Sequence, residues 1–524
     1  MNKHLHRIVF NAARGLRMVV QETAKSTGRG ARKATSGGVG AAVSVAAVAA
    51  AMMSAPLHAQ IVSDPGAPGG QRPTVLVAPN GVPLVNIQTP SAAGVSRNAY
   101  SQFDVQRNGA ILNNSRGNAQ TQLGGWVQGN PWLATGSARV IVNEVNSANP
   151  SQLRGHLEVA GPRTEVIIAN PAGIQVDGGG FINVNRATLT TGTPQFNAQG
   201  GLDSFVVRGG SVSIDGAGLD AAKTDYAAIL ARAVQVNAGI WANELKVVTG
   251  ANQVSAGSGQ ASPATGNGAA PSFALDVAAL GGMYAGKITL VGTEAGVGVR
   301  NAGHIGAGAG GLVVTAAGRL ENNGTIEGAK VELSSASDID NRGGTIRQAG
   351  TRDISITAPV LSNTQGGSIG AEPVAATPEA STGSGATGNE PTDGASAGTN
   401  AGTTLAATDS STAVAAAAGI AEATPAQPAA ATGPGAINAA GTILNDGGRI
   451  YARGPIALQT PNVNNDGGTL NVASMVLSGP AFSNAGGTLN VTNVFSANVG
   501  TFNNAAGKLQ AGSIAIATSG DLNN

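Results

Sequence analysis

Few side chains in this sequence are of a type that could carry out acid–base or nucleophilic chemistry. The 524 residues include no cysteine, which excludes thiol nucleophiles, disulfides and cysteine-ligated metal clusters. Beyond position 60 the only histidines are His156 and His304, so a Ser-His-Asp triad would need one of them. The simpler interpretation is a solvated polar residue in each case, His156 on a strand face and His304 in a turn.

One pair of carboxylates could serve a β-structured polysaccharide lyase. Asp338 and Asp340 are two residues apart, and such residues share one face of a strand. A calcium-dependent lyase needs several carboxylates that converge from adjacent coils, together with a basic residue. The sequence offers this single pair, with Arg342 close enough to neutralise it. We therefore expect no catalytic residues, no metal site and no cofactor, and a protein that is not an enzyme.

The composition points to a repetitive β protein. Glycine contributes 78 residues, aromatic residues make up 3% of the chain, and apolar residues make up 42%. A core built from Val, Ile, Leu and Ala suits stacked strands better than a globular enzyme. Eight of the 30 basic residues lie in the first 33 positions, and without that segment 22 basic residues face 28 acidic ones. A net charge of −6 argues against a nucleic-acid partner.

A short motif of Asn followed by Gly-Gly recurs through the second half of the chain. The apolar residue that follows each motif recurs at intervals of 19 or 20 residues, as Ile326 and Ile346, and then as Ile450, Leu470, Leu489 and Leu509. Short alternating strands such as Ile514-Ala515-Ile516 lie between the motifs. A repeat of this length cannot bury its apolar face alone, but stacked repeats can.

These repeats predict an all-β fold, a right-handed parallel β-helix with an N-terminal cap and coils of about 20 residues. Glycine permits the corners, and asparagine side chains are expected to stack in a ladder along the axis. A sandwich or a barrel is the alternative for alternating strands with glycine turns. The near-constant period and the scarcity of aromatic residues favour the β-helix. The cap is expected to occupy residues 60 to about 150 with the first coils.

The N-terminus has the anatomy of a secretory signal. A basic segment over residues 1–33 is followed by an Ala- and Val-rich run over 39–53 and by a small residue, Ala59. We predict a signal peptide over 1–59, cleavage between Ala59 and Gln60, and export by the Sec machinery. The first 22 residues also resemble the extended signal peptide of large Gram-negative exoproteins.

Two stretches interrupt the repeats. Residues 371–435 are rich in Ala, Thr, Gly, Pro and Ser and are expected to form a low-complexity flexible insertion. Residues 254–271 are expected to form a loop outside the helix that cannot order itself. β-helix repeats are predicted over 301–370 and again over 436–524. The last repeat is expected to be truncated, because the sequence stops where Gly-Gly should follow.

Residues 72 to 300 resemble the two-partner-secretion domain of filamentous haemagglutinins and contact-dependent growth-inhibition effectors. The residues that carry the resemblance are 80–87 (NGVPLVNI), 94–98 (GVSRN), 109–114 (GAILNN), 122–125 (QLGG), 130–133 (NPWL), 167–174 (IIANPAGI), 177–183 (DGGGFIN) and 187–192 (ATLTTG). We therefore assign residues 60–300 to a two-partner-secretion, or haemagglutination activity, domain. The usual Asn-Pro-Asn-Leu and Asn-Pro-Asn-Gly motifs have Trp132 and Ala172 in their third positions.

The resemblance implies that an outer-membrane β-barrel transporter recognises this domain in the periplasm. The residues with which we associate recognition are those of the two turn motifs: Asn130, Pro131, Asn170, Pro171, Gly173 and Ile174. Plain turn-making explains the same residues and can coexist with transporter contact. Unfolded passage through the transporter agrees with the absence of cysteine, because no disulfide can form in the periplasm to block threading.

Two functions follow from the resemblance. The first is a secreted filamentous adhesin at the surface of a Gram-negative bacterium, which would bind a host or bacterial cell-surface receptor. The alternative is the export and stalk part of a contact-dependent growth-inhibition toxin whose effector domain lies outside these residues. The stretch 178–183 (GGGFIN) looks more like growth-inhibition effectors than like adhesins, which favours the toxin alternative.

Overall fold

The structure is a computed structural model that describes residues 6–11, 16–21, 61–348, 354–370, 435–451 and 456–524. The chain divides into two compact units, Met1–His58 and Ala59–Asn524. In the first unit, β1 (His6–Asn11) and β2 (Leu16–Gln21) form an antiparallel hairpin. The predicted cleavage site at Ala59 and Gln60 lies outside the described residues. Residues 371–434, which make up nearly all of the predicted insertion, also lie outside them.

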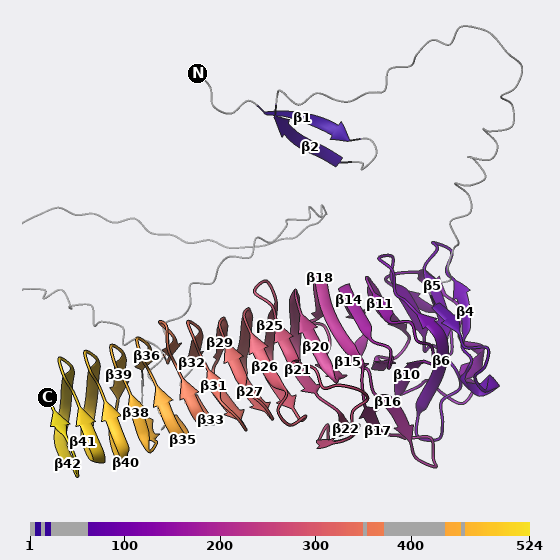
Figure 1. Cartoon of the computed structure of the whole chain (residues 1–524). Coiled ribbons are helices and arrows are strands. Elements are labelled where there is room, and N and C mark those ends of the chain that lie inside the picture. Colours follow the sequence, from indigo (N-terminus) through magenta and orange to yellow (C-terminus); the bar gives the residue numbers. More distant parts are fainter. Residues whose placement is uncertain (1–5, 12–15, 22–60, 349–353, 371–434, 452–455) are drawn as a thin grey trace, which may run out of the picture. The chain divides into compact units, whose positions relative to one another are not determined.

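The second unit is a parallel β-helix, which confirms the predicted fold class. Successive coils pair in parallel and follow one another in chain order (Figure 1). The strands that lie on the first face are β6 (Val95–Phe103), β10 (Val140–Val145), β13 (Thr164–Ala169), β15 (Val184–Thr190), β19 (Tyr226–Ala231), β30 (Val331–Ser335) and β37 (Ile456–Gln459).

The other two faces are built in the same way. Those on the second face are β7 (Ala110–Asn113), β12 (His156–Ala160), β29 (Thr325–Gly328), β32 (Thr345–Gln348), β34 (Ser368–Ile369), β36 (Arg449–Tyr451) and β39 (Thr469–Val472). Those on the third face are β11 (Ser151–Leu153), β20 (Ala233–Val236), β24 (Phe273–Val277), β26 (Gly298–Asn301), β28 (Leu320–Asn322), β31 (Ile339–Asp340), β38 (Asn462–Asn464) and β43 (Leu522–Asn523).

Longer strands bend around a corner and contribute to more than one face. They are β14 (Ile174–Ile182), β18 (Ser211–Ala221), β21 (Gly239–Thr249), β25 (Gly282–Gly292), β27 (His304–Ala316), β33 (Ile354–Ser362), β35 (Gly435–Leu444), β40 (Ser474–Ser483), β41 (Thr488–Asn503) and β42 (Lys508–Thr518). The pairing of β33 with β35 carries the stack across the interval 371–434. Among the described residues, no helix is long and apolar enough to cross a membrane.

The repeat period sets the register of the coils. The apolar residue after each Asn-Gly-Gly motif lies directly over its counterpart in the next coil, as Ile326 over Ile346 and Leu470 over Leu489. These side chains are 0–1% exposed and form a continuous column in the core. Alternate residues of a strand point to opposite faces of the sheet. An apolar residue at every second position is therefore enough to fill the interior.

The predicted asparagine ladder is present at the corner before this column. Each side chain donates from Nδ2 to the Oδ1 of the asparagine in the next coil, over 2.6–2.7 Å, through Asn301, Asn322, Asn341, Asn363, Asn445, Asn465, Asn484, Asn504 and Asn524. The members from Asn301 to Asn484 are fully buried. The ladder thus pairs the amide groups of side chains that the corner would otherwise bury at a cost, except for the Oδ1 of Asn301, where the ladder begins.

An antiparallel cap begins the stack. β4 (Thr74–Val77) and β5 (Pro83–Asn86) form a hairpin, and β3 (Ile61–Ser63) pairs antiparallel with β6. A second hairpin, β8 (Ala119–Thr121) with β9 (Gly125–Val127), projects between β7 and β10. Helix is limited, among the described residues, to the 3-10 turns η1 (Gly69–Gln71) and η2 (Pro131–Leu133).

The predicted loop at 254–271 is wrong in part, because strands occupy its beginning. β22 (Asn252–Ser255) and β23 (Ala261–Pro263) join β16 (Thr193–Phe196) and β17 (Leu202–Val207) in a four-stranded antiparallel sheet outside the coils. Val254 and Phe205 pack on outward-facing residues of the first face, among them Ile167 and Leu230. Tertiary burial therefore orders a segment whose own composition is too polar to do so.

Candidate functional site: the two Asn-Pro turns

The first sequence motif, Asn130-Pro131, opens the 3-10 turn η2. The Asn130 side chain is 3% exposed, and its Nδ2 donates to the carbonyl oxygens of Ile87 and Asn113, each over 2.9 Å. Its Oδ1 accepts from the Trp132 backbone N–H over 3.0 Å, which caps the turn. The side chain thus ties the cap hairpin to the first coil.

The surface of this turn is formed by its second and third residues. Pro131 and Trp132 are exposed, and the Trp132 indole N–H donates to Thr74 Oγ1 over 3.2 Å. Thr89 Oγ1 donates to the Trp132 carbonyl oxygen over 2.7 Å. The tryptophan that replaces the usual asparagine therefore packs across the cap hairpin instead of making a turn bond of its own.

An apolar groove of about 600 Å³ borders Pro131. It runs between strands β4 and β9, and it is lined by Leu76, Val77 and Trp126, which are 44%, 69% and 70% exposed. Monomeric proteins seldom leave such a group of large apolar side chains in contact with water. The first motif thus lies beside a surface with the character of a contact site.

The second motif, Asn170-Pro171-Ala172-Gly173, makes the corner between β13 and β14. Asn170 is fully buried, and its Nδ2 donates to the Asn149 carbonyl oxygen over 2.9 Å and to Ser151 Oγ over 3.0 Å. Its Oδ1 accepts from the Ala172 backbone N–H over 2.9 Å. Gly173 has a φ of +123°, which favours glycine, and Ile174 is buried in the core.

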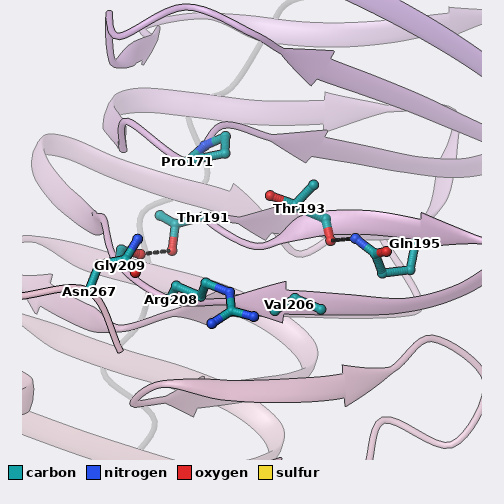
Figure 2. Close-up of a pocket in the computed structure, with 8 residues that line it drawn as sticks. All are labelled: Pro171, Thr191, Thr193, Gln195, Val206, Arg208, Gly209 and Asn267. Atoms are coloured by element: carbon teal, nitrogen blue, oxygen red, sulfur yellow. Dashed lines mark hydrogen bonds between the residues drawn. The ribbon is translucent and has the colours of Figure 1, made fainter. Parts of the chain in front are cut away.

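A cleft of about 360 Å³ lies where this corner meets the antiparallel sheet (Figure 2). Pro171 forms one wall, and Arg208 and Asn267 line the side toward β17. Thr191 Oγ1 donates to the Gly209 carbonyl oxygen over 2.7 Å, which fixes the floor. The cleft is shallow and polar, so it suits contact with a protein segment more than enclosure of a small molecule.

A nearly buried ion pair between Arg232 and Glu294 lies behind the cleft wall that Asn267 forms. Arg232 donates to the Glu294 carboxylate over 2.7 Å and also to the Asn267 carbonyl oxygen. The hydrogen bond from Arg232 lowers the pKa of Glu294 below its ordinary value. The pair ties the segment around Asn267 to the coils at β25 and keeps the cleft wall in place.

The two motifs are alike in that the asparagine is internal and the proline is external. A transporter could touch Pro131 or Pro171, but Asn130 and Asn170 are covered by their own turns. Their side chains therefore act on any recognition through the shape of the turn. The recognition role of Asn130, Pro131, Asn170, Pro171, Gly173 and Ile174 stays a prediction.

The residues considered for catalysis are dispersed. His156 lies on β12 against Gly180, and His304 begins strand β27, so its predicted place in a turn is wrong. Asp340 pairs with Arg342 over 3.3 Å, as the sequence suggested, while Asp338 faces Arg319 over 3.5 Å. Within the described residues, no three His, Cys, Asp or Glu side chains are grouped to hold a metal ion.

Comparison with known proteins gives two family matches. The model of the TPS secretion domain matches residues 59–326, and the model of the extended signal peptide of type V secretion systems matches residues 1–51. The chain is 54% identical to "Toxin CdiA" of Yersinia pestis over 356 residues, which is 66% of this chain and 11% of that protein.

A second curated relative and a solved structure are also similar to this chain. The chain is 48% identical to "tRNA nuclease CdiA-2" of Burkholderia pseudomallei over 342 residues, which is 63% of this chain and 11% of that protein. It thus spans about a tenth of the length of these curated relatives. Among solved structures, the filamentous haemagglutinin secretion domain is 31% identical, with a TM-score of 0.48, over 59% of this chain and 98% of that one.

Proposed function

This chain belongs to the TPS secretion domain family, and from that membership we propose that it is the export module and β-helical stalk of a large surface exoprotein. An extended signal peptide directs it across the inner membrane, and secretion across the outer membrane of a Gram-negative bacterium follows. The family implies a dedicated outer-membrane transporter as partner. The match over residues 59–326 is the observation that carries the proposal.

The proposed route begins with the Sec machinery and continues with recognition of the first coils by the transporter. The cap and the two Asn-Pro turns lie at the N-terminal end of the stack, so they emerge first and can start the folding of each later coil. Outside the cell, the stack presents its faces to a host or bacterial cell-surface receptor. In this role, as a filamentous adhesin, the segment needs no cofactor and no enzymatic activity of its own.

A second candidate function is supported by the names of the relatives. The two relatives described above are called a toxin and a tRNA nuclease, and each extends far beyond the region that matches. In that case residues 60–524 would form the export and stalk part of a contact-dependent growth-inhibition toxin, with its effector elsewhere. Export and display of the stack are common to both functions.

Expression with and without the transporter tests the export. We expect the chain to reach the culture medium only when its two-partner transporter is present, because the family implies a dedicated transporter as its route across the outer membrane. Immunoblots of medium and periplasm measure the distribution, and a chain without residues 456–524 serves as the control that retains the whole matched domain. Equal amounts in the medium without the transporter would contradict the proposal.

A further inference from the structure

Two large aromatic side chains lie exposed and side by side on the second face of the stack. Trp241 in β21 pairs in register with Tyr284 in β25, so the two belong to adjacent coils. Their ring centroids are 6.4 Å apart, and the ring planes differ by 17°. Trp241 is 44% exposed and Tyr284 is 38% exposed, although most large apolar side chains of this stack point inward. We call this pair the aromatic shelf.

Glycines let both rings lie down on the sheet. Gly239 and Gly282 precede the two aromatic residues by two positions, on the same strand face. A Cβ added to Gly239 would stand 2.4 Å from the Trp241 ring, and one added to Gly282 would stand 2.6 Å from the Tyr284 hydroxyl. Each ring therefore covers a bare stretch of backbone with one side and leaves the other side to solvent.

The same register column continues with polar groups at both ends of the shelf. Asp220 pairs with Trp241 in the preceding coil, and Glu327 with Arg347 follows two coils beyond Tyr284. Gly306 lies between Tyr284 and Glu327, and the His304 ring lies over it, 3.2 Å from the position of an added Cβ. From Trp241 to Glu327 the column spans three coils, roughly 14 Å at a strand spacing of about 4.8 Å.

Apart from Asp220, the charges around the shelf are paired within the protein. Glu327 accepts hydrogen bonds from Arg347 and lies 3.0 Å from His304 Nε2, and Lys287 donates to Glu244 over 2.8 Å. The His304 ring also contacts Tyr284 edge-on, with centroids 5.3 Å apart. The shelf is thus bordered by hydrogen-bonding groups, but these pairs leave little net charge to attract an ion.

We propose that the aromatic shelf binds a neutral glycan chain, with sugar rings stacked on Trp241 and Tyr284 and hydroxyl groups bonded to the paired polar side chains around them. The face of an aromatic ring is electron-rich and attracts the weakly positive C–H groups that line one side of a pyranose. At the rim, carboxylates can accept hydrogen bonds from sugar hydroxyl groups, and lysine and arginine side chains can donate hydrogen bonds to them.

Other ligand classes fit the shelf less well. A nucleic acid would also stack on aromatic rings, but it needs a basic groove, and residues 60–524 carry a net charge of −6. A cationic ligand is favoured by several unpaired carboxylates around the rings, whereas Glu244 and Glu327 have cationic partners and Asp220, at one end of the shelf, is a single carboxylate. A chain-like ligand suits the site because the shelf lies on an extended sheet that continues coil after coil.

This inference deepens the proposed function, because it gives the exported stack a class of surface ligand. It rests on the proposal that the stack meets other cells, yet the two can fail separately. Export is measured by the amount of chain in the medium, and binding is measured on the exported chain after purification.

Affinity electrophoresis of the exported chain tests the shelf. The probes are hydroxyethylcellulose, dextran, galactomannan and laminarin, each cast into native gels, with heparin and single-stranded DNA as charged probes. We expect at least one neutral polysaccharide to retard the chain. Trp241→Ala and Tyr284→Ala should each weaken that retardation at least about tenfold, as is usual for a central aromatic contact.

Two variants separate loss of binding from loss of folding. Trp241→Phe keeps a ring over Gly239 and should retain most of the retardation, whereas Trp126→Ala removes an exposed tryptophan of the cap and should leave it unchanged. The proposal is overturned if folded chain is retarded by none of the neutral probes, or if Trp241→Ala binds as well as the parent. Trp241-dependent binding of heparin or DNA alone would overturn the ligand class.

Discussion

Replacement of Gly468 by alanine destabilises its coil by about 3 kcal/mol, whereas the same change at the neighbouring Gly467 costs about 1 kcal/mol. At Gly468 a Cβ would stand 2.0 Å from the Asn445 carbonyl oxygen and 2.7 Å from Asn465 Oδ1. Neither atom can retreat, because both belong to backbone or ladder contacts between adjacent coils. Accommodation would require the coils to separate at this corner, with loss of ladder hydrogen bonds.

Gly467 is the matched control because glycine is favoured there by the backbone φ angle and not by a close contact with the next coil. Its φ is +63°, and no atom lies within 4 Å of the position of an added Cβ. Ala506 occupies the equivalent position of a later coil with a φ of +55°, which shows that this corner tolerates alanine. Hydrogen exchange of the exported chain is the suitable measurement, because a repeat stack opens locally. Equal protection in both variants would contradict the close-approach argument.

The double variant Asn130→Ala with Asn170→Ala secretes several-fold less chain than the parent. Each change leaves buried polar groups without a partner, among them the carbonyl oxygen of Ile87 and the hydroxyl group of Ser151, at about 1–3 kcal/mol per group. The cap and the first corner then lose the shape that presents Pro131 and Pro171. Destabilisation of this size changes the amount of a cellular protein several-fold.

Two comparisons show how the asparagines act. Asn149→Ala removes an exposed side chain but keeps the carbonyl oxygen that Asn170 contacts, so its secretion should match that of the parent. Trp132→Ala tests direct contact, because this side chain is exposed beside the first motif. The measurement is the ratio of chain in the medium to chain in the periplasm. Unchanged secretion of the double variant would contradict a role of Asn130 and Asn170 in export, and normal folding would then leave them as ordinary turn residues.

The regular part of the fold could be predicted because its information is local and repeated. The spacing of Ile326 from Ile346, and of Ile450 from Leu470, gives the coil length, and the recurring asparagines give the ladder. A cap was expected over residues 60 to about 150, and the antiparallel hairpin of β4 and β5 lies in this range. Each of these features depends on residues within one period of one another.

The parts that escaped prediction depend on contacts between distant residues. Strand β22 is ordered by the packing of Val254 against Phe205, which lies 49 residues earlier and outside the repeat period. The aromatic shelf was missed for a similar reason. Trp241 and Tyr284 are 43 residues apart, and the extra strands between them hide the fact that their coils are adjacent.

The sequence predicted the two Asn-Pro turns but not the burial of their asparagine side chains. Asn-Pro predicted a tight turn at both sites, and both turns are there. The sequence could not show that Asn130 reaches Ile87 or that Asn170 reaches Asn149, because the register of neighbouring coils decides those contacts. Whether the asparagine faces a partner or the core is therefore a property of the folded stack.

The central claim is that this chain crosses the outer membrane as an extended chain and winds into coils afterwards. A cysteine pair at Thr357 and Asn438 tests it, since these exposed residues are register partners in adjacent coils and a disulfide fits the spacing of about 4.8 Å. Oxidation in the periplasm would close a loop with 80 residues between the two positions. We predict that the double variant accumulates in the periplasm and that reductant restores its secretion, while each single variant is secreted normally. Secretion of the disulfide-closed periplasmic form at the level of the parent chain would contradict the account.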